Sequence, residues 1–93
     1  MKMDKQHRLT IPDFIRKAVK VEEGEVYYLE FKKDNEFALK KSTEGKIVER
    51  VKIDDHGRFI VPRSVTDIFD TKIIMYFVEG KNEIGISIFK ENT

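Results

Sequence analysis

The sequence contains no cysteine and no tryptophan, and it has only two prolines among its 93 residues. Without cysteine, the chain can form neither a disulfide nor a thiolate nucleophile or metal ligand, which suits a reducing cytoplasm. No apolar run approaches membrane-spanning length, and the basic start leads into no hydrophobic signal segment. There is also no glycine-rich phosphate loop and no metal-ligand cluster. We therefore expect a cytoplasmic protein with no metal, no cofactor and no membrane partner.

Catalysis receives little support from the residues that could perform it. His7 and His56 lie in turns beside aspartates, and a His–Asp pair can serve as a general base and its orienting group. However, Ser42 and Ser64 lack the strand–turn–helix setting of a nucleophile. Turn formation explains the aspartates and histidines better, because Asp bonds to nearby backbone and His tolerates left-handed conformations. We expect no catalytic residues and no enzyme.

Both prolines end copies of one motif. Residues 4–12 read DKQHRLTIP and residues 54–62 read DDHGRFIVP, so that Asp, Arg and Pro align at an offset of fifty. A unit of about forty residues is too small to bury a good core alone. We therefore predict a single domain, residues 1–93, made of two repeats that complete each other: a first half, 1–41, and a second half, 42–93.

The same order of elements is predicted in each half. A strand leads to Pro12 or Pro62, and each proline suits the first position of a short helix. Hairpins follow over residues 26–39 and 73–89, and a further strand covers 46–53. Apolar residues at helical spacing give the two helices inward faces, at 14, 15, 18 and 19 and at 65, 68 and 69. The prediction is a mainly β fold with two short helices, in which the apolar run 73–78 is buried on both sides.

The net charge of +1 is unevenly divided along the chain. Residues 1–20 carry +4 and residues 42–63 carry +1, whereas residues 21–41 and 64–93 carry −2 each. Positive charge therefore gathers around the two Arg-and-Pro segments. Such a one-sided field steers an anionic partner, although an ordinary solvated surface is the plainer explanation.

The arginines are the best candidates for function. In each half an arginine, Arg8 or Arg58, follows a turn and begins the strand that leads to proline. The planar guanidinium can bind phosphate oxygens or guanine edges through two bonds. Alternatively, each arginine pairs with its neighbouring aspartate and fixes the turn; both can hold, since an aspartate can orient an arginine that also meets DNA. The basic side chains expected to join them are Arg16, Lys17 and Lys20 in the first half and Arg50, Lys52 and Arg63 in the second.

Residues 41–62, KSTEGKIVERVKIDDHGRFIVP, resemble the start of the AbrB/SpoVT/MazE-like DNA-binding domain. The hallmark of that family is an acidic turn followed by Gly-Arg, an apolar strand and Pro. The first half looks like the same domain with its first strand shortened. The resemblance implies a swapped-hairpin β-barrel, in which two pseudo-symmetric copies interleave their strands.

The resemblance also implies which side chains contact DNA: Arg8, Arg16 and Lys17 in the first half and Arg58 in the second. The second half departs from the family pattern, because Thr66 and Asp67 stand where a basic pair is expected. Arg63, one turn earlier, is the substitute. The first half departs as well, since His7 stands where the second half keeps Gly57. We therefore expect a lopsided DNA face.

The function implied is a double-stranded DNA-binding transcriptional regulator, sequence-specific or semi-specific and associated with the nucleoid. The antitoxin branch of the family usually adds a long C-terminal segment, and only residues 91–93 follow the last predicted strand, so a toxin partner is not favoured. The alternative class is a protein-interaction or assembly module, or an antitoxin-like protein, that keeps the fold. The two halves can pair within one chain or with those of a second chain, as a homodimer.

Overall fold

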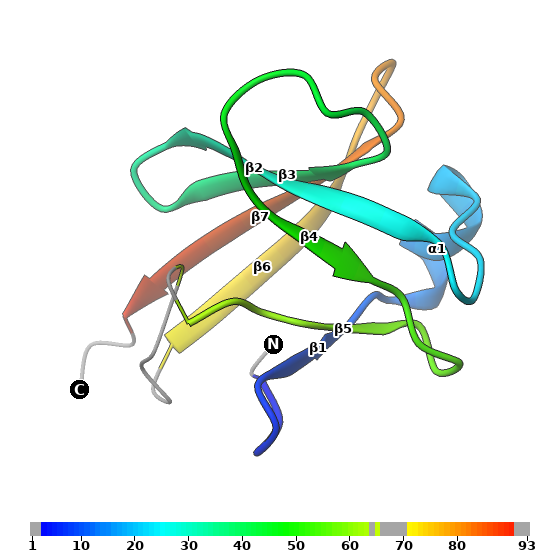
Figure 1. Cartoon of the computed structure of the whole chain (residues 1–93), viewed down its shortest axis with the longest axis horizontal. Coiled ribbons are helices and arrows are strands. Elements are labelled where there is room, and N and C mark those ends of the chain that lie inside the picture. The colour runs from blue at the N-terminus through cyan, green and yellow to red at the C-terminus, as the bar shows by residue number, and fades with distance from the viewer. Residues whose placement is uncertain (1–2, 64, 66–70, 91–93) are drawn as a thin grey trace.

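Seven strands and one helix make up the part of the chain that the computed structural model describes, residues 3–63, 65 and 71–90 (Figure 1). The prediction of a mainly β fold is confirmed. The second predicted helix falls largely on residues 64 and 66–70, which lie outside the described residues. The elements are β1 (Arg8–Thr10), α1 (Asp13–Val19), β2 (Val26–Lys33), β3 (Glu36–Lys40), β4 (Ile47–Lys52), β5 (Arg58–Ile60), β6 (Thr71–Val78) and β7 (Glu83–Lys90).

Each of the two sheets takes strands from both halves of the chain. The five-stranded sheet has the order β4-β2-β3-β7-β6, and the second sheet is the pair β1-β5. All neighbours are antiparallel, so β4 of the second half extends the β2–β3 hairpin of the first, and β3 pairs with β7. Figure 1 shows β1 and β5 side by side at one end of the molecule, below β4. Neither half builds a complete sheet from its own strands.

One hydrophobic cluster lies between the two sheets and α1. Leu9 and Phe59, which face each other across the β1–β5 pair, are both buried in it, as are Tyr27, Ile73 and Ile84. Removing such side chains from water is the main force that holds sheets of this size together. The core therefore belongs to both halves at once.

Helix α1 is short and differs from the prediction in where Pro12 lies, before the first helical residue and not at it, and in which side chains face inward. Pro12 precedes the helix, and its carbonyl accepts hydrogen bonds from the N–H groups of Ile15 and Arg16, both at 3.0 Å. Ile15 and Val19 are buried, but Phe14 is 68% exposed and Ala18 is exposed too, so the predicted inward face is wrong for Phe14 and Ala18. A helix of two turns that meets the core on one side buries only the residues one turn apart. No helix in the described ranges is long and apolar enough to cross a membrane.

Strand β6 is buried on one face only, so the prediction of burial on both sides is wrong. Ile73 and Met75 point into the core, whereas Ile74 is 47% and Tyr76 39% exposed. The strand is the last in the five-stranded sheet, and alternate side chains of a strand point to opposite faces. Within the described residues, the core covers only the inner face.

Candidate nucleic-acid interface

The turn before β1 is fixed by Asp4. Its Oδ1 accepts hydrogen bonds from the backbone N–H groups of Gln6 and Arg8, both at 2.9 Å, and its Oδ2 accepts one from Nε of Arg8 at 2.7 Å. His7 takes the left-handed conformation, with φ of 63°. The carboxylate thus holds both the backbone of the turn and the arginine side chain.

The turn before β5 repeats this geometry. Oδ1 of Asp54 accepts bonds from the N–H groups of His56 at 2.8 Å and Arg58 at 2.9 Å, and Oδ2 accepts Nε of Arg58 at 2.8 Å. Gly57 has φ of 71° at the position of His7. The predicted pairing of each arginine with a neighbouring aspartate is confirmed in both turns. In each case the two terminal guanidinium nitrogens have no partner among the described residues.

The hydrogen bonds keep both aspartates charged. For Asp4, the bond from the backbone N–H of Arg8 has the largest effect and lowers the pKa. For Asp54, burial raises the pKa, but the bonds from Arg58 and His56 outweigh it and lower the pKa to about 2. The carboxylates are therefore ionised at neutral pH, and each arginine is held in one orientation by a charged partner.

The β1–β5 pair brings the two turns onto one face. Leu9 pairs with Phe59 at its centre, and Arg8 and Arg58 pair with Ile60 and Thr10 on either side. The central pair points into the core, so Arg8 and Arg58 both leave from the opposite face, as diagonal neighbours about 7–8 Å apart.

Two further bonds tie each turn to the strand of the other half. The carbonyl of Gly57 accepts the N–H of Ile11 at 2.9 Å, and the carbonyl of His7 accepts the N–H of Val61 at 2.8 Å. The arrangement has approximate twofold symmetry about the Leu9–Phe59 pair.

Arg16 lies across the turn of the other half. A Cβ added to Gly57 would come within 2.3 Å of Nη1 and 2.8 Å of Cδ of Arg16, so the close approach depends on glycine at this position. Arg16 also forms an ion pair with Asp13 on its own helix. Sequence order grouped Arg16 with Arg8, whereas the fold puts Arg16 against the turn that carries Arg58. The one sequence signal for this contact was Gly57 itself.

The other predicted basic residues are less closely tied to these turns. Lys17 and Arg63 are exposed, and no described contact joins either one to Arg8 or Arg58. Thr66 and Asp67 lie outside the described residues. An open hollow of about 300 Å³ brings basic residues of β4 next to β5; it is lined by Glu49, Arg50, Val51, Lys52, Ile60 and Pro62. The arginine face, which we define as Arg8, Arg16 and Arg58, is thus the part of the candidate site that the fold brings together.

Residues for metal or acid–base chemistry do not gather in the same way. In residues 3–63, 65 and 71–90, no group of three or more His, Cys, Asp or Glu side chains could hold a metal ion. His56 Nε2 lies 3.6 Å from Oδ1 of Asp55, and both side chains are largely exposed. An exposed pair of this kind is typical of a surface turn.

No family model, no curated protein and no solved structure matches the chain. The resemblance to AbrB-like domains therefore stays a prediction carried by the residues named above.

Proposed function

We propose that this protein is a double-stranded DNA-binding transcriptional regulator of the AbrB-like type. Two copies of one unit would interleave within the chain and close into a swapped-hairpin barrel. Two observations support this architecture: both sheets combine strands of the two halves, and the Asp–Arg turn occurs twice with the same hydrogen bonds.

One observation carries the functional proposal. Arg8 and Arg58 start from the same face of the β1–β5 pair, and each is clamped at Nε by an aspartate that leaves the terminal nitrogens available. A guanidinium held in this way loses little rotamer entropy on binding and presents two donors to phosphate oxygens or to a guanine edge. Twofold-related arginines suit a duplex, whose two strands are themselves related by twofold axes.

Within this proposal the basic residues have different roles. Arg8 and Arg58 bind phosphates or base edges, and Arg16 supports the Arg58 side because it lies on the Gly57 turn. Lys17 and Arg63 contribute charge from the rim. Phosphate contacts supply most of the affinity, so binding weakens steeply with salt. Cytoplasmic, nucleoid-associated localisation follows from this function.

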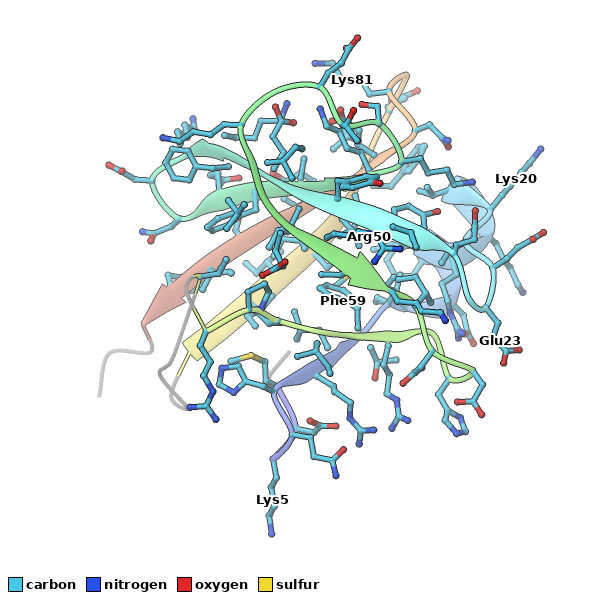
Figure 2. The ribbon with its side chains drawn as sticks, viewed as in Figure 1. Lys5, Lys20, Glu23, Arg50, Phe59 and Lys81 are labelled. Atoms are coloured by element: carbon cyan, nitrogen blue, oxygen red, sulfur yellow. The ribbon has the colours of Figure 1, made fainter. Side chains whose placement is uncertain are left out.

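The experiment is a titration of labelled duplex DNA with wild-type protein, R8A, R58A and the double variant at several salt concentrations. Each substitution should weaken binding and reduce the slope of log K against log salt by about 1. K81A is a matched control for loss of one positive charge, because Lys81 lies at the opposite end of the molecule from Lys5 and the β1 turn (Figure 2). Absent or salt-insensitive binding by wild-type protein would refute the proposal.

A second candidate function rests on the apolar residues next to the arginines. Ile60 is 63% exposed on the same face and pairs directly with Arg8, and Phe14 of α1 is 68% exposed. Exposed apolar side chains among arginines also suit a protein partner with an acidic rim. A discrete partner in a pull-down that is lost with I60K but kept with R8A/R58A would favour this interaction module.

A further inference from the structure

The outer face of the β1–β5 pair consists of four side chains. In the antiparallel register, Arg8 lies opposite Ile60, and Thr10 lies opposite Arg58. The central pair between them is buried in the core, and alternate side chains of a strand point to opposite faces, so all four leave from the other side. The two arginines therefore occupy one diagonal of a square, and Thr10 and Ile60 occupy the other.

The second diagonal consists of β-branched side chains that are open to solvent. Ile60 is 63% exposed, and Thr10 is exposed as well. The hydroxyl of Thr10 makes no hydrogen bond with another side chain in the described part of the chain. An isoleucine adds nothing to the binding of a phosphate, which needs hydrogen-bond donors and positive charge. Its exposure between two arginines instead suits an apolar group beside the arginines' ligand.

A two-stranded ribbon with this face fits the major groove of duplex DNA. Paired strands lie about 4.8 Å apart, and the groove is about 12 Å wide. Diagonal neighbours on the ribbon are about 7–8 Å apart, which is close to two base-pair steps of about 3.4 Å each. In this groove an arginine reads O6 and N7 of guanine, and an apolar side chain contacts the methyl group of thymine.

We propose that Thr10 and Ile60 are specificity-determining residues that contact thymine methyl groups in the major groove. Each thymine lies beside a guanine that is read by the arginine opposite, so that Arg8 and Ile60 read one half-site and Arg58 and Thr10 read the other. Each half-site is thus read by one strand from each half of the chain. This inference rests on the proposed function and adds which bases the protein selects.

The two half-sites are not read equally strictly. Ile60 offers only hydrocarbon, so its half-site requires the thymine methyl group. Thr10 offers a methyl group and also a hydroxyl, which donates to or accepts from other bases. The preferred duplex is therefore an inverted repeat in which one half is strict for thymine beside guanine and the other half tolerates several bases.

Replacing thymine by deoxyuridine tests the contact, because it removes only the methyl group. Duplexes are first selected from a random pool by wild-type protein, and the thymines beside the selected guanines are then replaced one at a time. We expect deoxyuridine in the strict half-site to weaken wild-type binding about fourfold. I60A should bind the thymine and deoxyuridine duplexes equally. I74A is the matched control, because it truncates an exposed isoleucine on β6, outside this face, and should keep the wild-type ratio.

A second pair of variants makes the two diagonal positions identical. T10I should make both half-sites strict, so that selection from the random pool returns thymine in both halves, and I60T should make both tolerant. Selection by wild type without thymine beside guanine, an unchanged thymine-to-deoxyuridine ratio in I60A, or a T10I selection that matches wild type overturns the inference.

The same measurements separate this inference from the proposed function. Wild-type protein that binds duplex DNA with a steep salt dependence and shows no thymine preference refutes the role of Thr10 and Ile60 alone. Wild-type protein that binds no duplex refutes the proposed function and this inference together.

Discussion

The two hairpins of this protein have the same plan and different surroundings. Each has an asparagine in the left-handed conformation at its turn, Asn35 with φ of 62° and Asn82 with φ of 54°. The β2–β3 hairpin is completed within the chain, because β4 pairs with β2. The β6–β7 hairpin has no described strand on its outer edge.

The outer faces of the two hairpins also differ: that of β2–β3 is covered by the chain, and that of β6–β7 is exposed. On β2, Glu30 is only 8% exposed and forms ion pairs with Lys40 at 2.9 Å and Lys32 at 3.1 Å. The segment between β3 and β4 passes over this carboxylate, and a Cβ on Gly45 would lie 1.9 Å from Oε2 of Glu30. The corresponding position on β6 is Tyr76, which pairs with Gly85 as Glu30 pairs with Ala38. One hairpin thus buries a charged network under its own chain, and the other presents an apolar surface.

The largest expected effect comes from removing the buried charge of Glu30 in the β2–β3 hairpin. In Glu30→Gln, the ammonium of Lys40 stays buried without its charged partner, and we expect the free energy of unfolding to fall by roughly 3 kcal/mol. Glu25→Gln is the control, because its ion pair with Lys41 at 3.0 Å is partly exposed and should contribute less than about 1 kcal/mol. Urea unfolding measures both; equal effects would show that burial of Glu30 does not matter.

The next prediction compares two glycines with the same backbone conformation. Gly45 has φ of 91° and Gly80 φ of 82°, but a Cβ on Gly45 meets Glu30, while one on Gly80 meets nothing within 4 Å. Gly45→Ala should therefore destabilise the protein by about 1–2 kcal/mol more than Gly80→Ala. Thermal and urea unfolding of the two variants give the difference. If Gly45→Ala and Gly80→Ala lower the stability equally, the segment between β3 and β4 can move away from Glu30 at no cost.

Acid should weaken the Asp–Arg turns. The folded-state pKa of Asp54 is about 2 and its ordinary value is 3.8, so its ionised form stabilises the fold above pH 3.8. That contribution is lost as the pH falls from 3.8 through about 2. The melting temperature of Asp54→Asn should therefore be lower than that of wild type at neutral pH and should fall less steeply in this range. Asp4→Asn tests the corresponding turn before β1. If the melting temperature of either variant depends on pH as steeply as that of wild type, the assigned hydrogen bonds of that aspartate are contradicted.

The smallest expected effect on stability comes from a substitution in the β6–β7 hairpin. Tyr76→Phe removes the hydrogen bond to Glu36 and should cost about 0.5–1 kcal/mol. Tyr28→Phe on β2 is the control, because Tyr28 makes no hydrogen bond to a side chain in the described residues. Removing its hydroxyl should leave the free energy of unfolding almost unchanged. Calorimetry of wild type and the two variants measures the difference.

The sequence predicted local features well and non-local ones poorly. The repeated Asp…Arg…Pro motif was visible because its residues are neighbours in the chain, and its hydrogen bonds span no more than four residues. The contact of Arg16 with the Gly57 turn was missed because it joins segments that only the fold brings together. Glu30 and Lys40 were missed for a similar reason, since charged residues are rarely buried unless a distant segment covers them.

The apolar run of β6 shows a different limit. A continuous apolar strand is typical of one covered on both faces by its own chain, and it is equally typical of one covered by a neighbour. Periodicity cannot distinguish these cases, because it records what a side chain prefers and not which molecule supplies the contact. Ile74 and Tyr76 are exposed, so the prediction of burial on both faces is wrong for this strand.

The hydrogen bonds from Val61 to the His7 turn and from Ile11 to the Gly57 turn have a consequence for how the two halves of the chain hold together. Cutting the backbone between β3 and β4 would break one covalent link and leave the β1–β5, β2–β4 and β3–β7 pairings in place. Two separately made fragments, 1–44 and 45–93, should therefore recognise each other and reassemble. Each fragment alone would have to expose the apolar surface that the other one normally hides.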